Sequence, residues 1–304
     1  MNKRRRKGRF FAASFGLTII ALVGLMAVLI LTPQSSSVPN SNLPNTLPTY
    51  PTAWAKYVPS DILEVSMINY SLIRALNSSA VPADEPLELV SPNESITPDM
   101  VRATLTITFQ TPNATVAMIY LTKSSFGQFA LSVVEAHGQE PGTKPSLYYT
   151  MAKVGNQSAS GWLALIPSDN IVAFAIGSSP ARTGVNLALE ASNGTVPNIL
   201  QNTTVRQILY IVNGTENHLS FSIQNFPGVV QTGSMTGISV DCVGSSIHIS
   251  YVVEFNDSST AKSQVDYMKT SYQSASVFNE YDQYLEALEY RPFSQMQFAV
   301  RLVG

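Results

Sequence analysis

The chain has one cysteine, Cys242, and few charged side chains, since only 12% of its 304 residues are Asp, Glu, Lys or Arg. A single cysteine excludes an intramolecular disulfide, so the folded part must be held together by packing and hydrogen bonds. We expect Cys242 itself to be a small buried apolar side chain. With so little charge, the polar surface must be built from Ser, Thr, Asn and Gln, which is typical of many extracytoplasmic domains.

Motifs of the common catalytic and nucleotide sites are also absent. The sequence has no His-Glu-x-x-His, no Gly-x-Ser-x-Gly, no phosphate-binding glycine loop and no Cys-His cluster. His137, His218 and His248 stand apart, and the last two fall on the polar phase of predicted strands, which favours solvent-facing side chains. We therefore expect no catalytic residue, no cofactor and no metal site, and the sequence disfavours an enzyme without excluding one.

The remaining candidates for chemistry have simpler explanations. An acidic stretch, Glu280, Asp282, Glu286 and Glu289, alternates with apolar residues at helical spacing, Phe278, Tyr281, Leu285 and Leu288. This pattern predicts the wet side of an amphipathic helix rather than a cation site. Tyr148, Tyr149 and Trp162 offer rings for stacking on a sugar or peptide, but aromatic residues in strands ordinarily pack in the core.

The chain begins with a basic cluster in residues 1–9 that leads directly into an apolar run. Residues 10–31 contain no charge and no proline, and these 22 residues would span about 33 Å as a helix, enough to cross a membrane. Basic residues stay on the cytoplasmic side of a membrane span. The sequence thus predicts a single-pass protein of the cell membrane, with a cytoplasmic N-terminus and an extracytoplasmic head.

Two other interpretations of this segment stay open. A cleaved secretory signal normally has a shorter apolar core and a small-x-small cleavage site, and neither is found here. Lys7-Gly8 ahead of the apolar run resembles the processing site of archaeal type IV pilins, which would imply a filament subunit. Arg9 at the mature N-terminus is unfavourable for a helix packed in a filament core.

Residues 32–52 are rich in Pro, Ser and Asn, a composition that favours extended conformations and predicts a stalk. Beyond residue 9 the chain has 12 Lys and Arg against 20 Asp and Glu, so this part carries a formal charge of −8. That charge argues against nucleic acid as a partner.

The rest of the chain predicts an α+β head made of two tandem, mostly antiparallel modules, at residues 53–195 and 196–304. An alternating strand pattern at 63–70 recurs at 219–226, and strands at 115–121 and 247–255 each lead through Ser or Asp into a helical pattern. We expect helices at 181–190 and 197–212 between the modules, and a strand at 295–303. One continuous sheet with similar-looking antiparallel strands is the alternative to a duplication.

Within the first module, residues 101–110 alternate between apolar side chains and Arg, Thr and Gln. This pattern predicts a strand whose threonine-rich face is wet. If helices leave that face uncovered, it is the best candidate for a contact surface.

Nine Asn-x-Ser/Thr sites exceed the roughly four expected by chance and predict a glycosylated surface. They are Asn69, Asn77, Asn93, Asn113, Asn156, Asn193, Asn202, Asn213 and Asn256. We expect Asn69 to be the least accessible, because it lies on the apolar phase of its strand. Many sequons without disulfides are the combination expected of an archaeal envelope protein.

The run Val58-Pro59-Ser60-Asp61 enters a strand that is followed by an Asn and a short helical pattern. This opening resembles that of uncharacterised secreted and membrane-anchored families built from repeated α+β units, over roughly 30 residues. The resemblance implies repeated units and no activity.

Taken together, these features predict a membrane-anchored, non-catalytic envelope or interaction protein, whose partner is an envelope protein or a glycan. The alternatives are a ligand sensor or enzyme with a cleft between the modules, and the pilin-like subunit. A cleft would need distant residues to converge, of which the sequence offers six: His137, Asp169, Glu190, Asp241, His248 and Glu254.

Overall fold

The structure, a computed structural model, describes residues 54–80, 87–89, 95–137, 145–154, 157–212, 218–225 and 235–303. The predicted tail at 1–9, membrane helix at 10–31 and stalk at 32–52 lie outside these residues. Within the described ranges, no helix is both long enough and apolar enough to cross a membrane.

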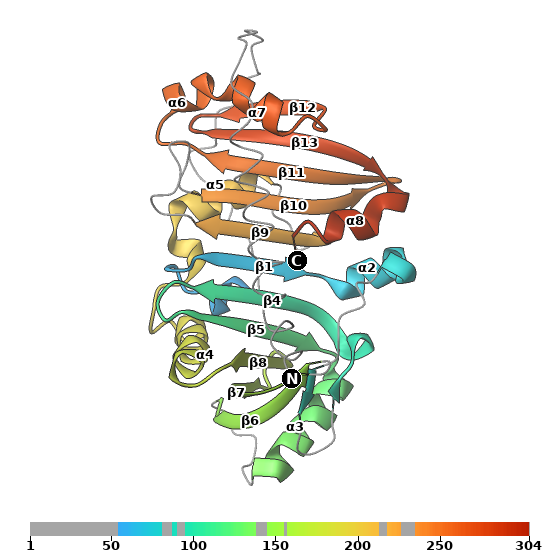
Figure 1. Ribbon diagram of the computed structural model, residues 1–304, viewed down its shortest axis with the longest axis vertical. Coiled ribbons are helices and arrows are strands. Elements are labelled where there is room, and N and C mark those ends of the chain that lie inside the picture. Colours follow the sequence, from blue (N-terminus) through green and yellow to red (C-terminus); the bar gives the residue numbers. More distant parts are fainter. Residues whose placement is uncertain are drawn as a thin grey trace, which may run out of the picture.

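The described strands form one 13-stranded sheet in the order β12-β13-β11-β10-β9-β1-β4-β5-β8-β7-β6-β2-β3 (Figure 1). Every neighbouring pair in it is antiparallel. The strands are β1 (Glu64–Ile68), β2 (Leu87–Leu89), β3 (Ser95–Ile96), β4 (Val101–Phe109), β5 (Ala114–Leu121), β6 (Leu147–Val154), β7 (Gln157–Ile166), β8 (Ile171–Ile176), β9 (Ser220–Asn225), β10 (Met235–Val243), β11 (Ser246–Glu254), β12 (Val277–Tyr281) and β13 (Tyr284–Pro292).

Helices pack on both sides of this sheet, which confirms the α+β class. The α-helices are α2 (Tyr70–Leu76), α3 (Lys123–His137), α4 (Ser179–Ser192), α5 (Thr203–Ile211), α6 (Ser258–Ser263), α7 (Val265–Ser271) and α8 (Met296–Val300). The short 3-10 helices are η1 (Ala55–Tyr57), η2 (Ser78–Ala80), η3 (Pro98–Met100), η4 (Ile199–Gln201) and η5 (Phe293–Gln295).

One face of the sheet carries the largest core, which α4, α5 and η1 cover. It includes Leu105 and Ile107 of β4, Val65 of β1 and Ile223 of β9, which are buried together with apolar residues of these helices. α5 approaches β10 closely, because a Cβ added at Gly237 would lie 2.4 Å from the Ile208 side chain. Any larger residue there would force the Ile208 side chain or the helix to shift.

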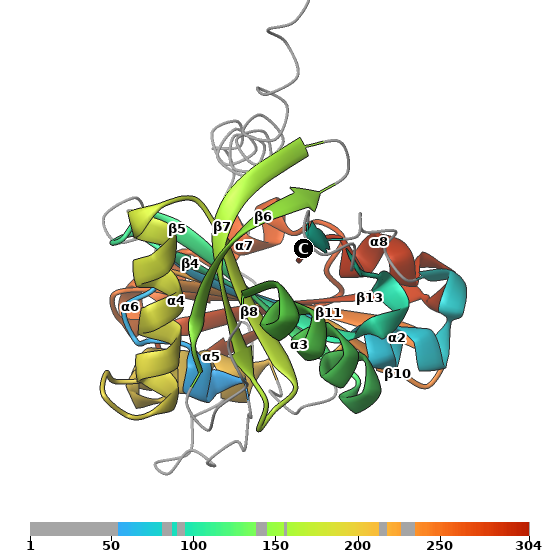
Figure 2. The same cartoon turned by 90° about the horizontal axis from the view of Figure 1, so that it is seen from below.

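The opposite face carries three smaller cores. α3 packs over β5, β7 and β8; α2 and α8 pack over β10 and β11; and α6 with α7 packs over β13. Figure 2, seen from below, shows α2 and α3 well separated from α4 and α5.

Side-chain oxygens begin several of these helices, as the sequence suggested for the strand-to-helix junctions. Asp257 accepts a hydrogen bond from the Thr260 amide at 2.7 Å, ahead of α6. Ahead of α3 the acceptor is the Thr122 hydroxyl, to which the Ser125 amide donates at 3.3 Å. The sequence had suggested a serine for this role. Such caps satisfy amides that have no partner inside the helix.

Most predicted elements are confirmed. The strands at 101–109 and 115–121 are β4 and β5, the helix at 181–190 lies within α4, and the pattern at 197–212 is η4 followed by α5. Two predictions are wrong. The acidic stretch at 278–289 is not a helix but the β12–β13 hairpin, and residues 295–303 form η5 and α8 rather than a strand.

Candidate functional site

The threonine-rich face of β4 lies on the side of the sheet that carries the three smaller cores. Its Thr106 and Thr108 alternate with buried Leu105 and Ile107, as predicted. Across the neighbouring strands the register places Thr115, Thr108, Glu64, Gln224 and Thr236 directly beside one another. This row crosses β5, β4, β1, β9 and β10, and therefore both halves of the chain.

We call this surface the polar strip: Glu64, Ser66, Thr106, Thr108, Thr115, Gln224 and Thr236, all of them half-buried or exposed. The Glu64 carboxylate accepts hydrogen bonds from Gln224 Nε2 at 3.0 Å and from Ser222 Oγ at 3.2 Å. The Thr108 and Thr115 hydroxyls lie 3.5 Å apart. The strip thus offers hydroxyl, amide and carboxylate groups for hydrogen bonding, with one acid held by its neighbours.

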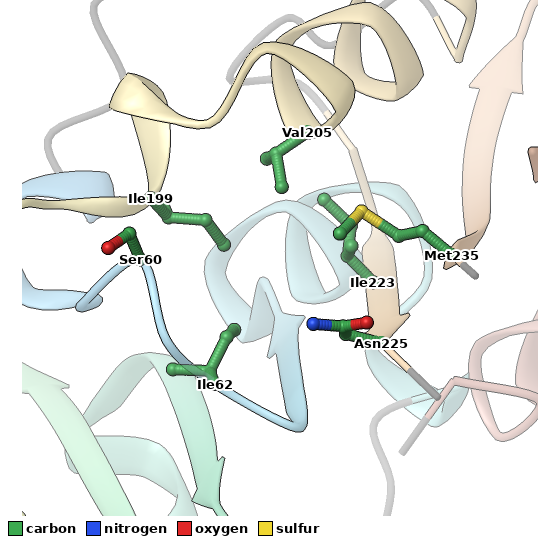
Figure 3. Close-up of a pocket in the computed structure, with 7 residues that line it drawn as sticks. All are labelled: Ser60, Ile62, Ile199, Val205, Ile223, Asn225 and Met235. Carbon is green, nitrogen blue, oxygen red and sulfur yellow. The ribbon is translucent and has the colours of Figure 1, made fainter. Parts of the chain in front are cut away.

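A small hollow lies where the two halves of the chain meet (Figure 3). Its cavity volume is only about 10 Å³, and it is lined by Ser60, Ile62, Ile199, Val205, Ile223, Asn225 and Met235. Pockets for small molecules usually have volumes of about 300–1,000 Å³ and contain a few directed polar groups. This hollow is smaller, and its lining carries no titratable side chain, so it supplies no group for acid-base chemistry.

Of the six residues that a catalytic cleft would have to bring together, Asp241 and His248 are direct cross-strand neighbours on β10 and β11, and the other four make their contacts elsewhere. His137 and His248 pack against different tyrosines, Tyr148 and Tyr290. Glu190 is exposed on α4.

The other three acids have partners of their own. Asp169 pairs with Lys56, Asp241 with His218, and Glu254 accepts hydrogen bonds from Thr204 and Gln283. Among the described residues, no three His, Cys, Asp or Glu side chains are grouped so that they could hold a metal ion.

His218 contradicts the prediction of a solvent-facing side chain, because only 7% of it is exposed. Its Nδ1 bonds the Asp241 carboxylate, while its Nε2 is buried without a hydrogen-bond partner among the described residues. Asp241 is also the direct cross-strand neighbour of His248, which is half-buried. A buried imidazole whose one nitrogen bonds a carboxylate has a fixed orientation. Cys242, predicted to be buried, is half-buried beside Asp241.

The acids at the C-terminal end of the sheet are buried rather than wet, which corrects the amphipathic-helix prediction. Glu286 is 4% exposed and accepts hydrogen bonds from Ser250 at 2.7 Å, Asn279 at 2.9 Å and Tyr281 at 3.3 Å. Glu280 and Glu289 are equally buried.

Glu289 lies on the other side of β13, where it bonds Ser274 Oγ at 2.8 Å and an Arg291 nitrogen at 2.5 Å. Buried carboxylates with several donors are structural groups that hold neighbouring strands together. These acids were predicted to lie at the surface of a helix. The segment is instead a β-hairpin, and the pairing of its strands places them at buried positions where they accept hydrogen bonds.

Another charged group joins η1 to the turn between β7 and β8. The Asp169 carboxylate bonds Lys56 Nζ at 2.6 Å and also accepts from the Tyr57 hydroxyl. Partial burial raises the pKa of Asp169, but the hydrogen bonds from Lys56 and Tyr57 outweigh it and hold the pKa below its usual value. Burial, and then the bond to Asp169, raises the pKa of Tyr57. The group is thus an ion pair with a neutral phenol, and it ties η1 to the sheet.

Six of the nine sequons fall on described residues, and they divide by exposure. Asn113, Asn193 and Asn256 are exposed, whereas Asn69, Asn77 and Asn202 are half-buried. Asn69 and Asn202 cap α2 and α5 through their side-chain oxygens. Asn93, Asn156 and Asn213 lie outside the described residues.

No protein-family model matches the chain, and no curated protein matches its sequence. Solved structures of the protein TP0453 are similar to it at low level. Crystal form I covers 82% of this chain and 96% of its own, with 9% sequence identity and a TM-score of 0.46. Crystal form IV covers 80% and 94%, with 9% identity and a TM-score of 0.44. A likeness at this level bears on neither the fold nor the function of the present chain.

Proposed function

We propose that this chain is a single-pass protein of the cell membrane whose head stands outside the cytoplasm and contacts an envelope protein or a glycan through the polar strip. The observation that carries this proposal is the strip itself. It presents hydroxyl and amide groups at the middle of a sheet face that is covered by α3 on one side and by α2, α8, α6 and α7 on the other.

A surface of this kind suits binding better than catalysis. A protein recognises its partner in part through hydrogen bonds from side chains at the interface. The strands of a sheet hold such side chains at fixed positions relative to one another. The strip's one acid, Glu64, already accepts two hydrogen bonds, and the row has no histidine, lysine or cysteine. Nothing in it would activate a nucleophile or shift a proton.

The membrane anchor is supported by the sequence at residues 10–31 and by the basic cluster before it. The stalk at 32–52 would hold the head away from the lipid surface. The excess of sequons supports an extracytoplasmic location, because these sites are modified only there.

We also propose that the head arose by tandem duplication. The strand order β1-β4-β5-β8-β7 in the first half corresponds to β9-β10-β11-β13-β12 in the second. A helix follows the third strand of each series, α3 after β5 and α6 after β11. The correspondence supports modules at 53–195 and 196–304, with β6, β2 and β3 as additions to the first.

Protease treatment of intact cells tests the anchor and its orientation. We expect external protease to remove the head and to leave a membrane-bound fragment that carries residues 1–31. A head that survives in intact cells but is cut after lysis would place it in the cytoplasm. A soluble protein that lacks residues 1–31 would show a cleaved signal instead, and either result would refute the proposal.

A further inference from the structure

A second surface lies on the β6–β7 hairpin beside α4. Tyr149 of β6 is 52% exposed, and its ring centroid lies 5.3 Å from that of its cross-strand partner Trp162. The Arg182 guanidinium of α4 lies 4.9 Å from the centre of the Trp162 ring. Met151, two residues beyond Tyr149, is 47% exposed. We call Tyr149, Met151, Trp162 and Arg182 the aromatic platform.

The platform is distinct from the polar strip, because the two lie on opposite faces of the sheet. The register from Thr106 through Ala117 and Phe174 to Leu163 shows that these side chains share one face. Trp162 is adjacent in sequence to Leu163 and therefore projects to the other face, as does its partner Tyr149. A ligand of the platform would not compete with a partner of the strip.

Tyr and Met side chains that lie exposed two residues apart on one face of a strand are unusual for a surface with no partner. Tyr148, the neighbour of Tyr149, is only 3% exposed and belongs to the core, as the sequence predicts for strand aromatics. Tyr149 has no such role, since more than half of it faces solvent. Its ring is held by β-sheet register and by Trp162, so it is a rigid surface for stacking.

The chain beyond residue 9 carries a formal charge of −8, so an anionic group can be held only beside a local cation such as Arg182, within the short range that salt does not screen. Arg182 is exposed, and its interaction in the described part of the chain is with the Trp162 ring and not with an acid. When a guanidinium stacks on an aromatic ring, its N–H groups point outward in the plane of the guanidinium. They can therefore donate two parallel hydrogen bonds to a carboxylate. Ser160 adds a hydroxyl whose contact is with the Met151 sulfur at 3.1 Å, a weak acceptor that a ligand oxygen would replace.

We propose that the aromatic platform binds a uronic acid residue of an acidic glycan. The sugar ring stacks on Tyr149, and its carboxylate pairs with Arg182. The combination of a flat apolar ring, a hydroxyl donor and a guanidinium stacked on the Trp162 ring fits a ligand with a C–H face, hydroxyl groups and one negative charge. A neutral sugar would leave Arg182 without its partner.

Calorimetric titration of the full chain in detergent with an oligomer of galacturonic acid tests this site. We expect binding that weakens roughly tenfold when the carboxylates of the oligomer are reduced to alcohols, and by a similar factor in Arg182→Gln, because either change removes the charged hydrogen-bonded pair. Tyr149→Ala should weaken the binding of the acidic oligomer and of the reduced oligomer by the same factor, because it removes stacking and not charge.

Two matched controls lie elsewhere on the surface. Arg102→Gln removes an exposed arginine from β4, and Tyr290→Ala removes a 44% exposed tyrosine from β13; neither should change the affinity. The proposal is overturned by absence of binding, by equal affinity for acidic and reduced oligomers, by equal losses in platform and control variants, or by tighter binding of an oligoglutamate peptide. None of these outcomes depends on the polar strip. A failure of this proposal would therefore not refute the proposed function, which has a separate test.

Discussion

Val65 of β1 lies directly opposite Ile223 of β9, in the antiparallel pair at the centre of the sheet. Both side chains are almost fully buried in the largest core, together with residues of α4 and α5. This pair joins the two halves of the chain, which therefore share one sheet and one core. Such an arrangement should unfold as a unit.

Removing side-chain volume at this junction should destabilise the whole head. We expect Ile223→Ala to lower the free energy of unfolding by about 3 kcal/mol, because it leaves a cavity in the shared core. Denaturant unfolding of the full chain, followed by hydrogen exchange in each half, measures this. Ile176→Ala, at a 55% exposed position of β8, is the control and should change stability by less than about 0.5 kcal/mol. If one half lost its protection while the other kept it, the junction would not couple them.

Glu286 should contribute to stability through its three donors. In Glu286→Ala the groups of Ser250, Asn279 and Tyr281 lose their acceptor in a buried place, and we expect a loss of about 3 kcal/mol. Glu286→Gln keeps one acceptor oxygen and should cost less. Glu135→Ala, at an exposed site on α3, is the control. If it lowered stability as much as Glu286→Ala, the buried hydrogen bonds of Glu286 would not contribute to stability.

His218 and Asp241 should behave as a coupled pair. Either single change, His218→Leu or Asp241→Leu, leaves a buried or half-buried polar group without its partner. The double variant removes both groups, so it should cost less than the sum of the single variants by about 1–3 kcal/mol. Denaturation midpoints of the four proteins give this coupling energy, and strictly additive values would refute the pair.

Three tyrosines, of which Tyr284 is buried and Tyr272 and Tyr281 are half-buried, predict a loss of stability at high pH. Burial raises the pKa of Tyr272, Tyr281 and Tyr284 from 10.0 to about 12, and nearby tyrosine or glutamate oxygens add to the shift. In the unfolded chain these phenols would lose their protons near pH 10. Their contribution to the free energy of unfolding is therefore fully present below that pH and is lost as the pH rises from about 10 to about 12.

The thermal unfolding midpoint, followed between pH 8 and pH 12, measures this loss. Tyr281→Phe has no ionisable phenol at that position and should make the decline shallower. A midpoint that stays constant up to about pH 12 would contradict the burial of these three groups.

Glycan occupancy should follow the exposure of the described sequons. We expect glycans at Asn113, Asn193 and Asn256, which are exposed, and lower occupancy at Asn69, which caps α2. Mass spectrometry of glycopeptides from the native protein gives the occupancy at each site. Higher occupancy at Asn69 than at Asn193 would show that attachment does not follow the folded surface.

The sequence predicts those parts of the sheet in which each strand alternates cleanly. In β4 apolar and polar side chains alternate throughout, and in β11 they alternate as far as Tyr251; both strands lie where the pattern predicts them. The threonine-rich face was predicted for the same reason. Its continuation through Glu64, Gln224 and Thr236 was not, because strand register depends on contacts between residues far apart in the chain.

The β12–β13 hairpin was missed because acidic residues were assumed to be wet. Phe278, Tyr281, Leu285 and Leu288 fit a helical spacing, but Glu280 and Glu286 are buried, with Glu286 bonded to donors from its own strand pair and from β11. Asp282, at φ 51, marks the turn. No local pattern shows that a carboxylate will find three donors.

The end of the chain did carry a local signal. Met296, Ala299, Val300 and Val303 follow helical spacing and pack together against β10 and β11, yet the apolar content of this segment suggested a strand. His218 has no comparable signal, because its partner Asp241 lies 23 residues away on another strand.

Site-specific photo-crosslinking in native membranes tests the central claim most directly. A photoreactive side chain at Thr106 or Thr108 in the polar strip should give a discrete adduct with one envelope component, whereas the same group at Leu131, which is 61% exposed on α3, should give none. Adducts at Leu131 but not at the strip, or no adduct at any of the three positions, would contradict the proposal that the polar strip is the contact surface.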